Sequence, residues 1–311
     1  MGLTIYDTTL RDGSQGEGIA FTLEDKLKIV KRLDKLGVDY IEGGWPGSNP
    51  KDEEFFEKVQ KLDLNNSEVV AFSSTRRPGI KAKNDTNINK LVESGVDTVT
   101  IFAKSWDFHV TEALEIPLEE NINMIADTVS YLKDNGLNVI FDGEHYFDGY
   151  KNNPEYAVKT LLTAEEAGAD LHVLCDTNGG MLTEQLRKIY KETKAEVKIP
   201  VGIHNHNDGG LALANTLAAY EEGTAQIQGT IGGLGERCGN VDLCHVIPSI
   251  KIKYKDESLD KIASEKLTST YFFVMETANL IADNSKPYVG KSAFTHKGGI
   301  HVSAVRKNPH T

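Results

Sequence analysis

The sequence predicts a (β/α)8 TIM barrel of the α/β class, followed by the start of a helical linker subdomain. Short runs rich in β-branched residues alternate with amphipathic helical stretches along most of the chain. Eight such units fit within about 250 residues, which is the usual size of this barrel. The alternation stops near Tyr254. We therefore expect a catalytic barrel over residues 1–255 and a helical extension over residues 256–311.

The expected elements follow one another in a regular order. The runs expected to form strands are Leu3–Asp7, Val38–Gly43, Glu68–Phe72, Thr98–Phe102, Asn138–Phe141, Leu171–Leu174, Val201–His204 and Gln226–Ile231. The expected helices are Glu24–Leu36, Asp52–Lys61, Asn87–Glu93, Glu119–Asn135, Pro154–Ala167, Thr183–Lys194, Gly210–Glu222 and Val241–Ile250. Thr22 is an N-cap candidate, and Gly37 and Gly136 stand where helices should end. Past the barrel, the apolar spacing over Leu259–Ile281 predicts one more helix.

A doubly wound open sheet is the competing fold. It usually has fewer units and a glycine-rich phosphate loop after its first strand. Here the first turn, Thr8–Gln15, carries a single glycine, and the later run Gly232–Gly239 does not match the G-x-G-x-x-G pattern. We therefore expect no dinucleotide site and favour the closed barrel.

Composition narrows the class of protein and its partners. The chain has 311 residues and a net charge of −12, which argues against nucleic acid or an anionic membrane surface as the main partner. Its three cysteines lack the paired spacing of a zinc knuckle or a redox motif, so we expect reduced thiols. We find neither an N-terminal leader nor an apolar run of about 18 residues. We therefore expect a cytoplasmic protein that binds neither nucleic acid nor membranes.

Two histidines at the end of the seventh expected strand are the first candidate metal ligands. His204 and His206 are two residues apart, so they point to one face of a strand. Asp12 follows the first strand and Asn240 follows the eighth, and in such barrels the strand ends converge on one mouth. Mixed nitrogen and oxygen donors suit Mn²⁺ or Zn²⁺, and Mg²⁺ chooses two histidines less often. The alternatives are histidines bonded only to their neighbours, and Asn240 as an N-cap for the next helix.

Other polar residues also fall at strand ends. Arg11 is placed to meet a carboxylate or a developing enolate oxygen, or else to pair with Glu42. Glu144 offers acid–base chemistry and Thr177 a hydroxyl for a substrate carboxylate. The ordinary alternatives are an arginine partner for Glu144 and a capping role for Thr177. His301 lies outside the expected barrel, where composition alone would favour a surface histidine.

Four motifs carry a resemblance to a known family. They are Asp7–Gln15, His204–Asp208, Gly233–Asn240 and His296–His301, in this order along the chain. Together they resemble the signatures of the 2-isopropylmalate, homocitrate and citramalate synthase family, whose barrel is similar to that of HMG-CoA lyase. Within it, Tyr40–Asp52 and Phe141–Lys151 resemble the citramalate synthase branch. Isopropylmalate synthases tend to have a phenylalanine and small residues where Trp45 and the residues after it stand.

The resemblance implies a reaction and a set of roles. The reaction is a Claisen-type condensation of acetyl-CoA with pyruvate, giving (R)-citramalate and free CoA on the route to isoleucine. The implied ligands of a divalent metal are Asp12, His204, His206 and Asn240. The resemblance also implies that Arg11 stabilises the keto oxygen and the enolate and that Thr177 binds the carboxylate of the oxoacid. It implies that Glu144 and His301 form the acid–base pair.

The resemblance also implies an assembly. Family members are homodimers whose chains continue into a regulatory domain, and the segment around His301 reaches the mouth of the other subunit. This chain stops at Thr311 without a closing element. We therefore expect a truncated form that lacks feedback control and has weak or no activity.

Three aromatic residues suggest how the oxoacid is selected. Trp45, Phe72 and Phe102 end the second to fourth strands, and their rings would admit a methyl group but exclude an isopropyl group. Two other functions stay open. One is a lyase that cleaves a 3-hydroxyacyl thioester, for which Cys238 in the glycine loop would be catalytic, although the His296–His301 motif favours a synthase. The other is a silent barrel that only binds a metal or an oxoacid.

Overall fold

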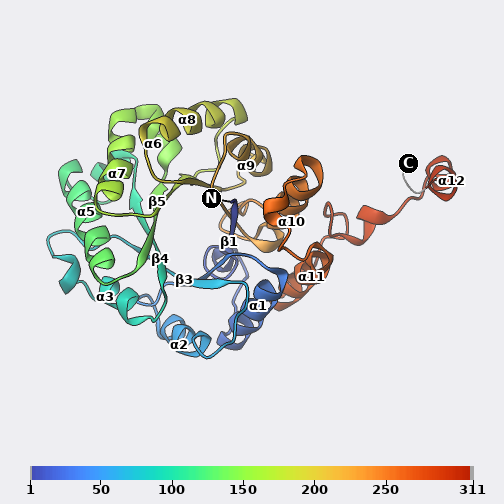
Figure 1. Ribbon diagram of the computed structural model, residues 1–311, viewed down its shortest axis with the longest axis horizontal. Coiled ribbons are helices and arrows are strands. Elements are labelled where there is room, and N and C mark those ends of the chain that lie inside the picture. The colour runs from blue at the N-terminus through green and yellow to red at the C-terminus, as the bar shows by residue number, and fades with distance from the viewer. Residues whose placement is uncertain (1, 309–311) are drawn as a thin grey trace.

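The computed structural model describes residues 2–308 and forms a closed barrel of parallel strands (Figure 1). The strands pair in the order of the sequence, and the first pairs with the last through four residues each. Their bounds are β1 Thr4–Asp7, β2 Tyr40–Gly44, β3 Glu68–Ser74, β4 Thr98–Lys104, β5 Asn138–Glu144, β6 Leu171–Asp176, β7 Val201–Asn205 and β8 Gln226–Gly229. The predicted (β/α)8 barrel is confirmed, with small shifts at the strand ends.

The helices form a ring around the strands (Figure 1). Their bounds are α1 Leu23–Leu36, α2 Pro50–Val59, α3 Thr86–Glu93, α4 Asp107–Glu112, α5 Leu118–Asp134, α6 Tyr146–Asn152, α7 Pro154–Glu166, α8 Thr183–Glu196, α9 Ala212–Glu221, α10 Leu243–Pro248, α11 Leu267–Thr277 and α12 Gly299–Lys307. Helix α1 begins as predicted, because Thr22 and Asp25 form a reciprocal capping box. It ends at Gly37, whose φ of 94° is open to glycine at little cost.

The strands alternate between two environments. We call the interior of the barrel the lumen, and the layer between the strands and the ring of helices the shell. On β4 to β7, the side chains of Val99, Phe141, Leu174 and Ile203 join the large apolar core that includes the helices. Their neighbours Ile140 and Val173 belong instead to a separate small cluster that contains no helix residue. Strand side chains therefore face the shell and the lumen in turn.

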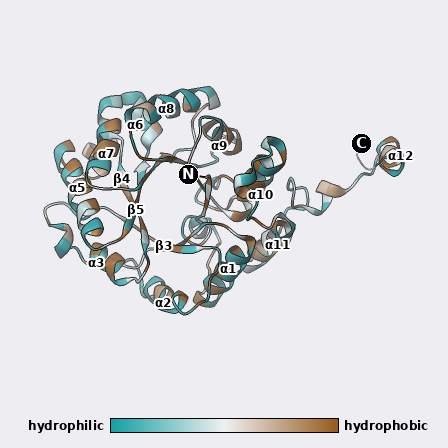
Figure 2. Cartoon of the chain, viewed as in Figure 1, coloured by the Kyte–Doolittle hydropathy of each residue, from teal (hydrophilic) through white to brown (hydrophobic). Residues whose placement is uncertain are grey.

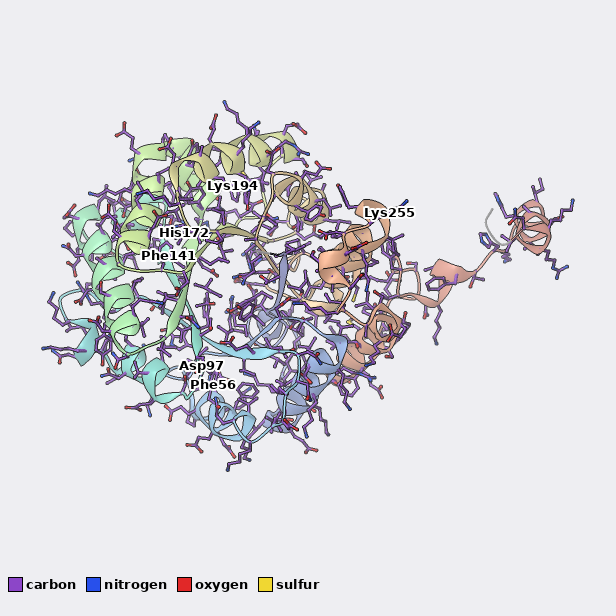
Figure 3. All side chains as sticks on the ribbon, viewed as in Figure 1. Phe56, Asp97, Phe141, His172, Lys194 and Lys255 are labelled. Carbon is purple, nitrogen blue, oxygen red and sulfur yellow. The ribbon has the colours of Figure 1, made fainter. Side chains whose placement is uncertain are left out.

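The shell is apolar and tightly filled. The ring helices carry both hydrophobic and hydrophilic residues, as an amphipathic layer requires (Figure 2). Phe141 and His172 lie close together on the adjacent strands β5 and β6 (Figure 3), with ring centroids 6.0 Å apart. Both side chains are fully buried, and Phe56 of α2 is 2% exposed. The free energy that holds the barrel together comes mainly from this layer.

Some elements differ from the prediction. The sequence did not predict α4 and α6, which are short helices after β4 and β5. The single helix predicted over Leu259–Ile281 is wrong, because the backbone leaves the helical region at Ala263 and only α11 is α-helical. The helix predicted over Val241–Ile250 is shorter, and it continues as a π-helical turn over Ser249–Tyr254.

The end of the chain leaves the barrel. Helix α11 packs against the core through Leu267, Tyr271 and Val274. Beyond it, the chain runs outward to α12, which lies well away from the barrel (Figure 1). The side chains there are open to solvent, and Ile300 is 85% exposed. The predicted boundary between residues 255 and 256 stays a prediction, although α11 packs as part of the barrel.

No helix within residues 2–308 has both the length and the apolar character needed to cross a bilayer.

Candidate metal centre at the barrel mouth

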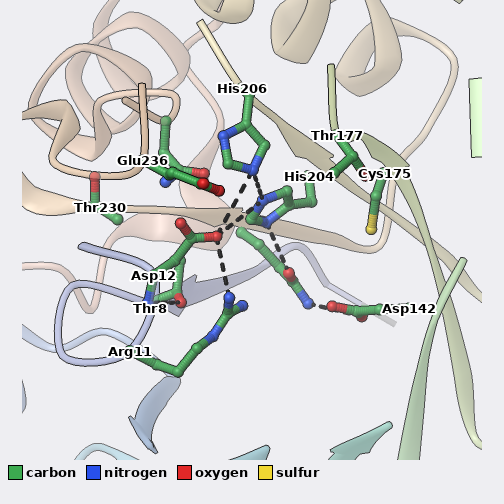
Figure 4. A network of polar contacts seen from close by, with 12 residues as sticks. Thr8, Arg11, Asp12, Asp142, Cys175, Thr177, His204, His206, Thr230 and Glu236 are labelled. Carbon is green, nitrogen blue, oxygen red and sulfur yellow. Dashed lines mark hydrogen bonds and ion pairs between the residues drawn. The ribbon is translucent and has the colours of Figure 1, made fainter. Parts of the chain in front are cut away.

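Three ligand-type side chains converge at the mouth of the barrel (Figure 4). His204 is on β7, His206 follows that strand, and Asp12 is in the loop after β1. Oδ2 of Asp12 lies 3.4 Å from Nε2 of His204 and 3.8 Å from Nε2 of His206, and the two Nε2 atoms are 3.3 Å apart. All three residues are at least 95% buried. The convergence that the strand-end argument predicted is therefore present.

Electrostatics make this cluster a cation site. Burial by itself would raise the pKa of the Asp12 carboxyl, but the Arg11 guanidinium and the two imidazoles outweigh it and hold that pKa well below its usual range. Burial and the neighbouring His204 lower the pKa of His206 to about 4. Burial opposes a charge on His204, but the Asp12 carboxylate outweighs burial and raises the pKa of His204. The cluster thus offers a carboxylate anion at Asp12 and a neutral imidazole at His206, which are protonation states that metal binding requires.

Polar atoms without partners point to the same conclusion. Among the described residues, no hydrogen-bond partner exists for Asp12 Oδ1 or for Asn240 Oδ1, although both atoms are buried. Asn240 pairs across a bridge with His206, and its amide nitrogen donates to the Leu234 carbonyl at 3.2 Å. Its oxygen is therefore the free end of the amide. A buried acceptor is normally satisfied, so these oxygens fit a divalent cation as the missing partner.

The capping alternative for Asn240 is wrong. Helix α10 begins at Leu243, and its N-cap is Asp242, whose side chain accepts from the Cys244 N–H at 2.8 Å. Asn240 precedes this cap by two residues and contributes no cap bond of its own. It stays a candidate ligand beside the triad.

Arg11 is held rigidly at the edge of the site. Its Nε donates to Glu42 Oε2 at 2.5 Å, and its Nη1 lies 3.2 Å from Asp12 Oδ2. The guanidinium also stacks over the Phe72 ring, 3.9 Å from the centroid. Glu42 is fixed in turn by the hydroxyls of Tyr6 and Thr8. The expected alternative, a Glu42 salt bridge, is therefore real, and it orients Arg11 while leaving the guanidinium on the cavity wall.

Glu144 and Thr177 lie on the far side of the same mouth. Glu144 Oε2 is 2.5 Å from Lys104 Nζ, so its partner is a lysine rather than the arginine considered above. Thr177 Oγ1 accepts from the backbone N–H of His145 at 2.8 Å. His145 has a φ of 56°, which is uncommon outside glycine and aims this N–H at the hydroxyl. The hydroxyl proton of Thr177 therefore remains available to donate to a ligand.

These residues enclose one cavity of about 220 Å³. It is lined by Arg11, Asp12, Gln15, Trp45, Phe72, Phe102, Asp142, Glu144, Cys175, Thr177, His204, His206 and Glu236. The rings of Phe72 and Phe102 stack 5.2 Å apart, and Trp45 meets both edge-on. Most of the predicted site residues therefore share one cavity. Asn240, which forms a bridge with His206, is not among the residues that line this cavity.

Four residues of this lining were not among the predicted site residues: Gln15, Asp142, Cys175 and Glu236. The signal for Asp142 and Cys175 was the alternation itself, since Asp142 stands two residues before Glu144 on β5 and Cys175 stands two residues before Thr177, which directly follows β6. Gln15 and Glu236 lie in loops, where no periodicity gives the side-chain direction.

His301 is not brought to the mouth in this chain. It is an exposed residue of α12, which lies away from the barrel (Figure 1), and its ring centroid is 6.3 Å from that of His296. Its catalytic role therefore stays a prediction.

The fold and the site together define a class. The molecule is a (β/α)8 barrel with a carboxylate–imidazole triad of metal-binding geometry, and an arginine beside it, at the carboxyl ends of its strands. Within that class, the chain belongs to the HMGL-like family, which matches residues 2–272.

Individual relatives share much more than the fold. The chain is 52% identical to an (R)-citramalate synthase of Geobacter sulfurreducens over 307 residues, which are 99% of this chain and 58% of that protein. It is 37% identical to the homocitrate synthase AksA of Methanopyrus kandleri, over 99% of this chain and 74% of the other. The chain thus spans a little over half the length of the citramalate synthase.

A solved structure confirms the architecture. The HMG-CoA lyase of Brucella melitensis superposes with a TM-score of 0.76, over 89% of this chain and 99% of the other. Its sequence is only 18% identical, so this likeness concerns the fold alone.

Proposed function

We propose that this chain is the catalytic barrel of an (R)-citramalate synthase, which condenses acetyl-CoA with pyruvate and releases CoA. The observation that carries the proposal is one cavity that joins a cation site, a fixed arginine, a carboxylate and an aromatic wall. Identity to an (R)-citramalate synthase exceeds identity to a homocitrate synthase, 52% against 37%, which supports this branch of the family.

In the proposed site, Asp12, His204, His206 and Asn240 hold a divalent ion, with Mn²⁺ or Zn²⁺ favoured over Mg²⁺ by the two imidazoles. When bound, the ion supplies Lewis-acid polarisation of the 2-oxo group. Arg11 then faces the developing oxyanion with a guanidinium that needs no reorientation, because Glu42 and Phe72 already fix it. The Thr177 hydroxyl donates a hydrogen bond to the carboxylate of the oxoacid.

Glu144 is the proposed base for the acetyl methyl group. An acetyl thioester is a weak carbon acid, so its deprotonation needs a positioned base and a stabilised enolate together. Lys104 orients the Glu144 carboxylate through their ion pair. The enolate carbon then attacks the keto carbon of pyruvate, and hydrolysis of the thioester makes the sequence irreversible.

We propose a cytoplasmic homodimer in which a second copy of the chain supplies its His301 to this mouth. The exposed position of His301 on α12, away from its own barrel, supports this arrangement (Figure 1). Mixing a Glu144→Gln variant with a His301→Ala variant should restore part of the activity that each lacks alone, since one mixed mouth would then be complete.

The test of the reaction is release of CoA thiol from acetyl-CoA with pyruvate, followed by chiral chromatography of the product. Release that depends on pyruvate and is abolished by EDTA is expected. Cleavage of a 3-hydroxyacyl-CoA without condensation would show a lyase instead. Cys238, which a lyase would use, does not line the mouth cavity, and this favours the synthase. Failure of both reactions would leave only a silent binding barrel.

A further inference from the structure

A buried glutamine lies beside one member of the triad. Gln228 is on β8, in register with His204 on β7, and is 0% exposed. Its Oε1 is 3.0 Å from Nδ1 of His204. Its Nε2 is 3.2 Å from Oδ1 of Asp142 on β5, across the lumen, and Figure 4 marks this contact at Asp142. Gln228 therefore joins a carboxylate to the far side of the imidazole.

The neighbours of Gln228 fix which way its amide points. Its nitrogen lies near Asp142 Oδ1 and, at 3.5 Å, near Gln226 Oε1. Burial raises the pKa of Asp142 to about 7, and above that pH its carboxylate can only accept hydrogen bonds. The NH2 group must face these two oxygens, because a flipped amide would place its oxygen against two other acceptors. The amide oxygen is then left to face Nδ1 of His204, which has to donate a proton to it.

The hydrogen bond from Nδ1 of His204 to Gln228 decides whether Nε2, the nitrogen that faces the candidate metal site, carries a proton. With the ring proton on Nδ1, Nε2 of His204 carries a lone pair directed toward Asp12 and His206. His206 differs, because its Nδ1 is buried without a hydrogen-bond partner among the described residues. Within residues 2–308, His204 is thus the one imidazole of the pair whose Nδ1 is bonded to a side chain.

We propose that Gln228, anchored by Asp142, is a positioning residue that fixes the tautomer and ring orientation of His204 for metal binding. This inference rests on the metal centre of the proposed function and deepens it. Outer partners of metal-bound histidines typically change affinity by about 10- to 100-fold. Gln228 touches neither the cavity nor the site of the ion, so it acts only through His204.

The first test is binding of Mn²⁺ alone, followed by the electron paramagnetic resonance of the free ion. Gln228→Leu should weaken binding by about 10- to 100-fold. Asn121→Leu on α5 is the matched control, since it removes a buried amide that bonds to the Lys104 carbonyl and the Tyr156 hydroxyl rather than to His204 or Gln228, and it should retain the affinity of the unchanged protein. Equal affinity of the Gln228→Leu variant and the unchanged protein would overturn the proposal.

An exchange of groups separates positioning from general stability. Gln228→Glu alone places two carboxylates against each other and should weaken Mn²⁺ binding. The double substitution Gln228→Glu/Asp142→Asn keeps the net charge and reverses the donor and acceptor between the two residues, while an oxygen still accepts from His204 Nδ1. Binding should return to near that of the unchanged protein. If the double variant binds as weakly as Gln228→Glu, the relay is not the cause.

A direct readout of the tautomer completes the test. In metal-free protein labelled with ¹⁵N-histidine, at a pH where the ring is neutral, His204 should show a protonated Nδ1 and an unprotonated Nε2. Its signals are assigned by their loss in His204→Gln. A mixture of both tautomers is expected in Gln228→Leu, and an unchanged Nδ1 proton would refute the proposal. If the unchanged protein shows the predicted tautomer but binds no Mn²⁺, the proposed metal centre is wrong. Gln228 would then orient His204, but not for metal binding.

Discussion

The lumen and the shell of this barrel are built from alternate residues of the same strands, yet the lumen buries most of the charged strand residues and the shell most of the apolar ones. The shell joins strand residues such as Phe141 and Ile203 to apolar helix faces. The lumen buries His204, Gln228 and Asp142, which are linked by hydrogen bonds, and it also buries Glu42, which accepts from the Tyr6 hydroxyl. Burying such groups contributes little net stability even when they are paired, whereas apolar burial is strongly favourable. The same strands thus carry stability on one side and chemistry on the other.

The largest difference in activity is expected between a variant that lacks a histidine of the lumen and a variant that lacks a histidine of the shell. His204→Leu in the lumen should lower kcat/KM for pyruvate and acetyl-CoA by at least about 10³-fold, because a ligand and its Lewis-acid chemistry are lost. Its melting temperature should change little. His172→Leu in the shell is the control and should keep most of the activity, since His172 is fully buried behind the strands. Similar activity losses in both variants would contradict the division.

A large stability effect is expected from phenylalanines on adjacent strands. Phe141→Ala empties a fully buried site in the shell and should lower the free energy of unfolding by about 3–5 kcal/mol. Phe102→Ala on β4, half-buried at the mouth, should lower it much less. Equilibrium urea unfolding followed by circular dichroism measures both. A larger loss for Phe102→Ala would show that the lumen, and not the shell, carries the stability.

A buried shell histidine also predicts how stability depends on pH. Burial lowers the pKa of His172 to about 4, with Glu165 at 3.7 Å opposing the shift. The unfolded imidazole titrates near about 6.5, so between these values the unfolded chain binds more protons and the free energy of unfolding falls as the pH falls. The contribution is complete above about pH 6.5, and about 2–3 kcal/mol of it is lost by about pH 4.

The variant His172→Leu isolates this effect from other titrating groups. The difference in unfolding free energy between the unchanged protein and the variant should be constant above about pH 7 and should shift in favour of the variant on acidification. Urea titrations at several pH values give this difference. A difference that does not depend on pH would mean that His172 keeps its ordinary pKa in the fold.

The strands and most of the site could be predicted because both follow from local periodicity. Runs such as Thr98–Phe102 and Val201–His204 have strand-type composition, and the closed topology then brings their ends to one mouth. Asp12, His204 and His206 needed nothing more than this argument. Their approach to within 4.8 Å follows from barrel closure.

What escaped prediction depends on contacts between distant segments. Alternation gives the face of a strand residue but not its neighbour across the barrel, so the Gln228 and Asp142 contact stayed hidden. The short helix α6 depends on Gly149, where any Cβ would lie 2.1 Å from the Ser105 carbonyl oxygen. The apolar residues near Leu259 were interpreted as helical, although their burial against the barrel decides their conformation.

Substitutions at the mouth test whether the aromatic wall selects the oxoacid independently of the polar residues of the lumen. Phe102→Ala should remove part of the wall that excludes a branched oxoacid and shift the ratio of kcat/KM for 2-oxoisovalerate over pyruvate by about 10- to 200-fold. Phe72→Ala is the informative comparison, because Phe72 also supports Arg11 at 3.9 Å. It should lower kcat/KM for both oxoacids as well as change their ratio. Steady-state CoA release with each oxoacid measures both parameters. If the unchanged enzyme already prefers 2-oxoisovalerate, the aromatic wall does not select pyruvate, and the assignment to the citramalate branch is wrong.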